Sequence, residues 1–450
     1  PMGAGRSSDI VVVAGDQTQV YGGVGSYPTP YLRDGFGTSA LLDFPSSVSY
    51  DPVSNALYFT ECYTEFDSII DGWYEGSLTV RKYDINSGYV SKYVGYDFSQ
   101  NRDSNGFYVT SGGYQEGWGG VAKFSYPLTI SYGFSKLGGP VLYIADYFNN
   151  AIRTVYTAIG AVPAITTNKP TSKPTSFPTN FPSTIPTFQP TSRPSSLPSS
   201  TPTLSPTIDY RFINVSTAVS QSGVVGVEPG YYLGKYGVYM STGNQILFLN
   251  GSDLSDKNSG KPTTVLRVAG GTSSGDSDGT FSASSASFNT ASRMKYDSSS
   301  NTLFVASDAS GLIRILDLSS QNVYTVSNSN NNRIVFSSPS QLNSGGRYPG
   351  MDIDKSGSYL YVTDRRNIYN LTRVSGSSNI YTYVRRQYTA LNSFMTANSW
   401  PTTCYIFGIV TVESQQVIYA TVSLSINVLL KIPMGAGRSS DIVVVAGDQT

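Results

Sequence analysis

Three aspartates that end apolar segments are the acidic residues best placed to do chemistry in this chain. Asp146 ends VLYIAD, Asp308 ends FVASD and Asp364 ends YLYVTD. Such carboxylates could line a channel or bind calcium, whereas a lone aspartate at a strand end usually hydrogen-bonds the following turn. The segment GDSDGT from Gly275 matches a D-x-D-x-D-G calcium loop only in part. The pattern therefore favours the turn-forming role and predicts no metal site and no cofactor.

The sequence contains no histidine, which removes several classes of active site. Ser-His-Asp triads, Cys-His dyads and histidine-ligated zinc or iron all require that residue. The glycine-rich segments near Gly23 and Gly270 precede no helix that could receive a phosphate. We therefore expect no catalytic residues, and a protein that is not an enzyme.

Amide and hydroxyl side chains offer a different chemistry, the attachment of sugars. Asn-x-Ser/Thr sequons make Asn214, Asn250 and Asn370 candidates for N-glycosylation. In residues 166–207, proline occupies every fourth position from Pro170 to Pro206, each time followed by Thr or Ser. The candidates for O-glycosylation or hydroxylation are Pro170, Thr171, Pro174, Thr175, Pro178, Thr179, Pro182, Ser183, Pro186, Thr187, Pro190, Thr191, Pro194, Ser195, Pro198, Ser199, Pro202, Thr203, Pro206 and Thr207.

Residues 166–207 should form a polyproline II linker, because proline fixes φ and lacks the amide hydrogen that helices and central strands need. Three residues make one turn of that helix, so a four-residue repeat directs its hydroxyl groups to every side. Such a surface suits dense O-glycosylation, and an unmodified disordered spacer is the alternative. With 34 tyrosines in the chain, tyrosine-lined grooves could hold this segment, unless those residues are ordinary strand residues.

Cys62 and Cys404 are the two cysteines of the chain. Two cysteines are too few for a small domain held together by disulfides. Either both are buried free thiols, or they form one disulfide in an oxidising compartment.

Charge and hydropathy also exclude partners. The 30 basic residues balance 30 acidic ones, and charged residues make up 13% of the chain, about half the usual share. This balance gives no electrostatic basis for binding nucleic acid or an anionic membrane surface. The apolar stretch from Cys404 to Val412 is the size of a strand, and no run approaches the length of a membrane-spanning helix. We expect no nucleic acid and no membrane insertion.

Short apolar segments recur along the chain outside the linker. They begin at Ala56, Val141, Gln245, Thr302, Tyr359 and Val417. A polar segment that contains Asp-Gly or Glu-Gly precedes several of them, and we call this segment the approach. An apolar strand that ends in Ala-Gly, or in a degraded form of that pair, follows at Ile10, Val90, Val265 and Ile442. Strands this short bury little apolar surface alone, so they are expected to stack around an axis.

The order of these segments resembles the NHL-repeat β-propeller family, in which each repeat supplies one four-stranded blade. The likeness is best over residues 115–155 and 265–316 and weakest around Ile246 and Ile418, and some repeats lack the Asp-Gly and Asn-Asn-x-Ile-Arg elements. The resemblance implies an all-β fold: a six-bladed NHL-like β-propeller of four-stranded antiparallel blades, interrupted by or joined through the polyproline II segment. That segment is similar to Pro-Thr/Ser tetrapeptide repeats of algal and protist extracellular glycoproteins.

The two ends of the sequence are identical. Residues 433–450 repeat residues 1–18 letter for letter, which predicts a tandem array with a period of 432 residues, a single terminal duplication being the alternative. We expect about two blades in 1–165, with the outer strand of a preceding blade at 10–14, and about four in 208–450. The propeller would close across the repeat boundary, or within one copy with the linker as an excursion between blades.

Together these features predict a structural subunit of an extracellular glycosylated filament or cell-surface coat, built from tandem or head-to-tail propeller repeats. Its expected partners are further copies of itself and covalent glycans, and its expected location is extracellular or at the cell surface. The alternative is an adhesin or lectin-like ligand-binding propeller on a mucin-like stalk. The fold alone does not choose between them, because propellers serve many functions.

Overall fold

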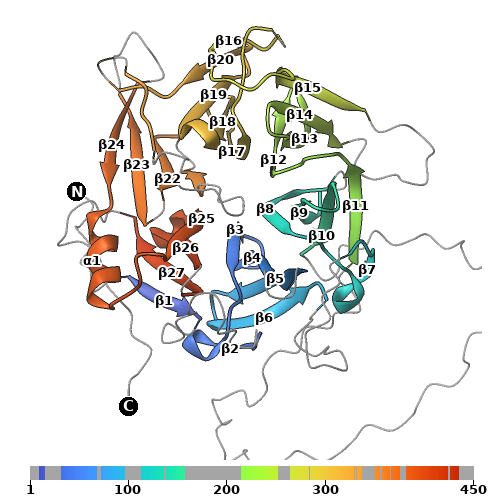
Figure 1. Ribbon diagram of the computed structural model, residues 1–450, viewed down its shortest axis with the longest axis vertical. Helices are drawn as coiled ribbons and strands as arrows, with labels where there is room; N and C mark the ends of the chain where they lie inside the picture. Colours follow the sequence, from blue (N-terminus) through green and yellow to red (C-terminus); the bar gives the residue numbers. More distant parts are fainter. Residues whose placement is uncertain are drawn as a thin grey trace, which may run out of the picture.

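In the computed structural model, six antiparallel sheets stand around a common axis as the blades of a β-propeller (Figure 1). The inner strands of neighbouring blades contact one another around the whole ring. The all-β, six-bladed propeller predicted from the sequence is therefore confirmed. The structure describes residues 10–15, 32–67, 72–96, 113–135, 138–157, 214–251, 264–282, 284–328, 330, 332–336, 350–354, 357–364, 366–374, 382–423 and 426–434.

We number the blades I to VI in the chain order of their inner strands. Blade I contains β2 (Gly35–Phe36), β3 (Pro45–Asp51), β4 (Ala56–Asp67), β5 (Gly72–Asp84) and β6 (Tyr89–Val94), with the 3-10 turn η2 (Gly37–Ser39). Blade II contains β7 (Gly117–Trp118), β8 (Pro127–Phe134), β9 (Pro140–Asp146), β10 (Ala151–Tyr156) and β11 (Asn214–Ser220), with η4 (Gly119–Val121). Blade III contains β12 (Gly226–Tyr232), β13 (Lys235–Ser241), β14 (Gln245–Asn250) and β15 (Val265–Gly270).

The remaining three blades follow the same plan. Blade IV contains β16 (Gly279–Thr280), β17 (Ala291–Asp297), β18 (Thr302–Ser307), β19 (Leu312–Asp317) and β20 (Asn322–Thr325), with η7 (Asp308–Ser310). Blade V contains β21 (Met351–Ile353), β22 (Tyr359–Asp364), β23 (Asn367–Arg373) and β24 (Tyr383–Gln387). Blade VI contains β25 (Tyr405–Val412), β26 (Val417–Ser423), β27 (Val428–Pro433) and β1 (Val11–Ala14), with η9 (Glu413–Gln415).

Each pair of neighbouring blades encloses its own hydrophobic cluster. Strand β9 shows why the segments are so apolar, since Leu142 and Ile144 face blade I while Tyr143 and Ala145 face blade III. A sheet that is packed on both faces needs apolar residues at successive positions. The cores therefore lie between the blades, and each blade depends on both neighbours for its stability.

The α-helix α1 (Thr389–Ala397) connects blade V to blade VI, and the sequence analysis did not anticipate it. Its side chains Leu391, Phe394 and Met395 are buried in the cluster between these two blades. These residues stand at positions i, i+3 and i+4, which lie on one face of a helix. Among the described residues, no helix is both long and apolar enough to pass through a membrane.

The apolar segments identified in the sequence all lie in strands. Those that begin at Ala56, Val141, Thr302, Tyr359 and Val417 supply second strands, counted outward from the channel. The segment at Gln245 is instead the third strand of blade III, because β13 takes the second place. The segments from Ile10, Val90 and Val265 form the fourth strands β1, β6 and β15, counted outward from the channel, and the segment from Ile442 lies outside the described residues.

The ring closes within this chain. Strand β1 pairs antiparallel with β27 as the outer strand of blade VI, with Val11 opposite Lys431 and Val12 opposite Leu430 (Figure 1). The outer strand expected at residues 10–14 is therefore β1, and it completes a blade of its own chain.

The linker region lies within one blade in chain order. Strands β10 and β11 pair with each other in blade II, and residues 158–213, which include the predicted linker at 166–207, stand between them in the sequence and lie outside the described residues. The expected division between 1–165 and 208–450 therefore cuts through blade II, whose outer strand comes from the second part of the chain.

Candidate functional site

Polar side chains from several blades meet in the channel of the propeller. The ammonium of Lys295 on β17 lies 3.1 Å from Asp352 Oδ1 on β21 and 3.5 Å from Glu228 Oε1 on β12. All three side chains are at least three-quarters buried. One cation held between two carboxylates thus joins blades III, IV and V.

Both carboxylates also accept hydrogen bonds from the blades on either side. The hydroxyl of Ser131 on β8 donates to Glu228 Oε2 at 2.7 Å. The amide and hydroxyl of Thr411 on β25 donate to Asp352 Oδ2 at 2.6 and 2.8 Å. Buried charges are tolerated when such partners replace the lost water. The network therefore extends over five of the six blades.

Arg293, also on β17, connects blade IV to blade I across the channel. Its Nη1 donates to Ser47 Oγ at 3.0 Å and its Nη2 to the carbonyl of Ser46 at 3.5 Å. A cavity of about 30 Å³ lies among the inner strands, beside Arg293 and Lys295. The described side chains at this level therefore leave a small space between the blades.

The charges in the channel hold Lys295 in its protonated form. Burial by itself would lower the pKa of Lys295, but Asp352 and Glu228 outweigh that effect and raise the pKa above its usual value. Burial raises the pKa of Glu228, and Lys295 partly offsets this increase. A lysine acts as a base or nucleophile near neutral pH when its pKa is lowered. The arrangement around Lys295 therefore ties blades together and does not activate an amine.

Asp146 has the turn-forming role that the sequence favoured. Its Oδ1 accepts a hydrogen bond from the amide of Ser125 at 2.7 Å, and its Oδ2 accepts from Asn149 Nδ2 at 2.7 Å and from Arg153 Nη1 at 2.8 Å. Burial raises the pKa of this carboxyl to about 6, although Asn149 and Arg153 act in the opposite direction. Asp146 thus fixes the loop after β9 outside the channel.

Asp308 and Asp364 occupy related places in blades IV and V. Asp308 begins η7, accepts a hydrogen bond from Ser292 Oγ at 2.7 Å, and has a pKa that burial raises well above its usual value. Asp364 ends β22, and its carbonyl accepts from Asn367 Nδ2 at 3.4 Å. The three aspartates lie in three different blades, and within the described ranges no group of three or more potential metal ligands occurs.

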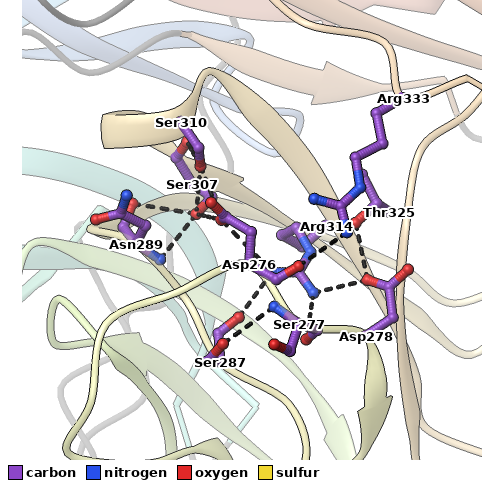
Figure 2. Close-up of polar contacts among 10 residues, drawn as sticks. All are labelled: Asp276, Ser277, Asp278, Ser287, Asn289, Ser307, Ser310, Arg314, Thr325 and Arg333. Atoms are coloured by element: carbon purple, nitrogen blue, oxygen red, sulfur yellow. Dashed lines mark hydrogen bonds and ion pairs between the residues drawn. The ribbon is translucent and has the colours of Figure 1, made fainter.

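A second polar arrangement, which the sequence analysis missed, recurs in blades I, II and IV. In blade IV the fully buried Arg314 of β19 donates to the carbonyls of Ser277 at 2.8 Å and Ser287 at 2.7 Å, and it pairs with Asp278 at 2.8 Å (Figure 2). Ser277 and Ser287 belong to the Asp-Gly approach that precedes the inner strand. The arginine thereby fastens this approach to the third strand, and we call the arrangement the arginine clamp.

The clamp is built from the same parts in the other two blades. Arg153 of blade II and Arg81 of blade I are also fully buried. The acceptor carbonyls are those of Gln115 and Lys123 for Arg153, and those of Arg33 and Leu41 for Arg81. A signal for the clamp was present in the sequence, because the acidic-Gly approach and the arginine of the third strand occur together or not at all.

The candidate glycosylation residues are distributed over separate blades. Asn214 begins β11, Asn250 ends β14, and Asn370 lies within β23. Asn250 and Asn370 are partly buried, and Asn370 Oδ1 accepts a hydrogen bond from Thr372 Oγ1 at 3.0 Å. The candidates for O-glycosylation at 170–207 lie outside the described residues.

The two cysteines are buried and are not joined by a disulfide in this structure. Cys62 lies in the hydrophobic cluster between blades I and II, and Cys404 lies in the cluster between blades V and VI. Burial raises the pKa of the Cys62 thiol to about 12. A thiol in such surroundings is a poor nucleophile at neutral pH.

No family model and no curated protein matches the sequence of this chain. Several solved structures are similar to it. They include a streptogramin B lyase (10% identity, TM-score 0.39, covering 90% of this chain and 99% of that one) and virginiamycin B lyase from Staphylococcus aureus (9% identity, TM-score 0.37, 86% and 94%). A chain of a nidogen/laminin complex is also similar (9% identity, TM-score 0.36, 73% and 76%). Likeness of this degree assigns no activity to the chain.

Proposed function

We propose that this chain is a structural repeat unit, with NHL-like blades, of an extracellular glycosylated filament or cell-surface coat. The observation that carries the proposal is the duplication of the strand that completes the propeller. Strand β1 closes blade VI, and its sequence recurs at residues 443–446. A unit whose closing strand occurs at both of its ends can be joined in series while each copy keeps the means to complete its own fold.

The contents of the channel support a role without catalysis. Lys295 forms ion pairs with Glu228 and Asp352, and the cavity beside these three side chains has a volume of about 30 Å³. The chain also has no histidine to serve as an acid, a base or a metal ligand. A scaffold needs a rigid ring more than an open channel, and these contacts supply it.

The position of the linker in the blade supports a sugar-coated surface. Strands β10 and β11 lie on the outer side of blade II (Figure 1). The two strands that flank the predicted linker in the sequence therefore lie away from the channel, and sugars on the linker would not need to pass through the inner strands. A coat of neutral sugars would keep a chain with only 13% charged residues hydrated.

Electron microscopy of the native material with a carbohydrate stain tests this proposal. We expect filaments or a continuous layer with a propeller-sized repeat, stained for sugar, and a loss of mass from residues 166–207 after chemical deglycosylation. Isolated single propellers without carbohydrate would overturn the proposal.

An exposed aromatic patch favours a second candidate, a lectin-like or adhesive propeller. Phe134, Tyr231 and Leu233 are 43%, 51% and 68% exposed at the ends of neighbouring hairpins in blades II and III. The hydroxyl of Tyr236 accepts a hydrogen bond from the amide of Phe134 at 2.8 Å and joins the two hairpins. Exposed rings that stand close together suit contacts with sugar faces or prolines.

Binding measurements separate the two candidates. For an adhesin, Tyr231→Ala should weaken binding to an oligosaccharide panel at least about tenfold, the loss of one aromatic anchor. The control Leu266→Ala removes an apolar side chain that is 42% exposed on the outer strand of blade III and should leave binding unchanged. If neither the wild-type chain nor its variants bind any member of the panel, the adhesin is excluded.

A further inference from the structure

The edge of β27 forms a docking groove for one strand. Ile10, which is fully buried, and Val12 pack into the cluster between blades V and VI, while Ala14 packs into the cluster between blades VI and I. Gly15 has a φ of +95°, and a Cβ at this position would overlap the carbonyl oxygen of Asn427. The groove therefore selects a short apolar strand that ends in Ala-Gly.

Residues 442–447 meet every one of these requirements. Their sequence, IVVVAG, is identical to that of residues 10–15. Each buried side chain, the small residue and the glycine recur in the same order. The groove contacts only the side chains and backbone of the strand bound in it. Because these are identical in the two copies, no contact in the groove distinguishes one copy from the other.

The topology also permits the exchange. Strand β1 runs antiparallel to β27, with Val11 opposite Lys431 and Ala14 opposite Leu429. A chain that turns back after β27 would place Val443 opposite Lys431 in the same direction and register. Blades III and V, where the outer strand follows the third strand directly in the chain, are built in this way.

We propose that the groove on β27 is a strand-acceptor site that binds residues 442–447 of the same chain in place of β1. The propeller then has two alternative closures of equal packing, and the occupant of the groove determines which end of the chain is released. The released strand carries an unpaired apolar edge.

The two closures differ in the loop that each requires. Residues 434–441 connect β27 to the C-terminal copy, whereas residues 16–31 connect β1 to the first described residues of blade I. The probability of closing a flexible loop falls with the three-halves power of its length, so the shorter loop favours residues 442–447 by about threefold. Both closures should therefore be populated at equilibrium.

The exchange has a consequence for an array, which rests on the proposed function. In a tandem chain, one strand stands between two propellers and can complete either the preceding or the following one. The segment between the propellers then corresponds to residues 16–31 or to residues 434–441. Fully extended, these span at most about 55 Å and about 28 Å respectively, so strand exchange would change the spacing of the units without unfolding them.

Competition between two disulfides in the full chain tests the proposal. Lys431→Cys is combined with both Val11→Cys and Val443→Cys, and the protein is equilibrated in a glutathione buffer. Residues directly opposite each other in antiparallel strands are close enough for a disulfide. We expect peptide mapping to show both the 11–431 and the 431–443 disulfide within one chain, with the second about three times as abundant.

Two results would overturn the proposal. One is an 11–431 disulfide with no detectable 431–443 disulfide. The other is a 431–443 disulfide found only in dimers, which would make a second copy the occupant. If micrographs show filaments but only the 11–431 disulfide forms, strand exchange is overturned and the proposed filament is not. If both disulfides form but the native protein is monomeric, the filament is overturned and strand exchange is not.

A glycine pair provides a test that needs no added cysteine. Gly15→Ala should block docking of β1, and Gly447→Ala should block docking of its copy. Each single variant keeps one intact strand, so its unfolding midpoint should stay close to that of the wild-type chain, while the double variant should show a clear drop. If Gly15→Ala alone lowers the midpoint as much as the double substitution, the proposal fails.

Discussion

Blades I, II and IV differ from blades III, V and VI at one position of the third strand. In the first group this position holds the buried Arg81, Arg153 and Arg314, which lie opposite Phe59, Ile144 and Val305 of the second strands. In the second group the equivalent residues are Leu247, Tyr369 and Leu430, which are also buried. The backbone pairing is the same in both groups, so the side chain at this position does not determine whether a blade forms.

What differs is the segment that leads into the blade. Each clamped blade has an approach with Asp-Gly or Glu-Gly, whose short strand β2, β7 or β16 adds to the outer edge of the sheet. The arginine adds a second hydrogen bond to carbonyl groups of this approach, such as those of Gln115 and Ser277, which already accept one from a backbone amide of the approach. The comparison teaches that the arginine and the approach form one unit, which is present or absent as a whole.

The strongest test of this comparison replaces an arginine of a clamp. Arg153→Met removes the cation beside the buried carboxylate of Asp146 and the side-chain donor to the carbonyls of Gln115 and Lys123. Breaking a buried ion pair in this way should lower the free energy of unfolding by about 3–5 kcal/mol, measured by urea denaturation. The matched control is Leu247→Met at the equivalent position of blade III, where a change of shape at similar volume should cost less than about 1.5 kcal/mol. Equal losses in the two variants would contradict the clamp.

The sequence was sufficient to predict the blades because their signal is local. Segments such as those at Val141 and Tyr359 combine apolar residues on both faces with a turn, and they lie in strands as expected. The pairing of β10 with β11 could not be predicted in this way, because the residues between them carry no strand signal. Helix α1 was missed because its apolar residues, Leu391, Phe394 and Met395, are few and stand between two strand-rich regions.

The polar sites were harder to predict because they depend on contacts between blades. Three inner strands carry Lys295, Glu228 and Asp352, and no motif near these residues in the sequence marks them as partners. Only the packing of blades III, IV and V against one another brings Glu228 and Asp352 within 3.5 Å of the Lys295 ammonium. For the clamp, by contrast, the two parts recur together along the chain, so a comparison of the repeats could have found it.

The second test concerns the channel, where charges join blades rather than fasten one blade to its approach. Lys295→Met leaves Glu228 and Asp352 facing each other without their cation. We expect a loss of about 2–4 kcal/mol in the free energy of unfolding, slightly below that of Arg153→Met because Lys295 is not fully buried. The control Lys235→Met, on an exposed position of β13, should change stability by less than about 0.5 kcal/mol. If the channel side chains served only to exclude water, Lys295→Met and Lys235→Met would change the free energy of unfolding equally.

The third test uses pH to separate the clamp of blade I from the others. Burial raises the pKa of Glu61 from 4.5 to about 7, although Arg81 lowers it in part. The folded state therefore binds this proton more tightly than the unfolded state, so the contribution is full below about pH 4.5 and is lost as the pH rises to about 7. At 1.36 kcal/mol for each pKa unit, it amounts to about 3 kcal/mol.

Urea denaturation between pH 4.5 and 7.5 measures this contribution. In Glu61→Gln the part of the stability loss that comes from residue 61 should disappear, while Asp146, whose pKa burial raises to about 6, still titrates in blade II. An unchanged pH profile in the variant would show that Glu61 stays ionised beside Arg81 throughout this range.

The smallest expected effect comes from replacing the partly exposed carboxylate of the clamp in blade IV. Asp278 accepts from Arg314 and from Thr325 Oγ1, each at 2.8 Å, but its side chain is 42% exposed. Water screens such a pair, and an asparagine oxygen can accept the same two bonds, so Asp278→Asn should cost less than about 1 kcal/mol. Arg314→Met in the same blade should cost several times more, because Arg314 also holds the carbonyls of Ser277 and Ser287.

A loss for Asp278→Asn as large as that for Arg314→Met would mean that the ion pair, and not the arginine-to-carbonyl contact, holds the approach in place. The blades with leucine or tyrosine at this position would then lack a charge pair rather than a backbone anchor.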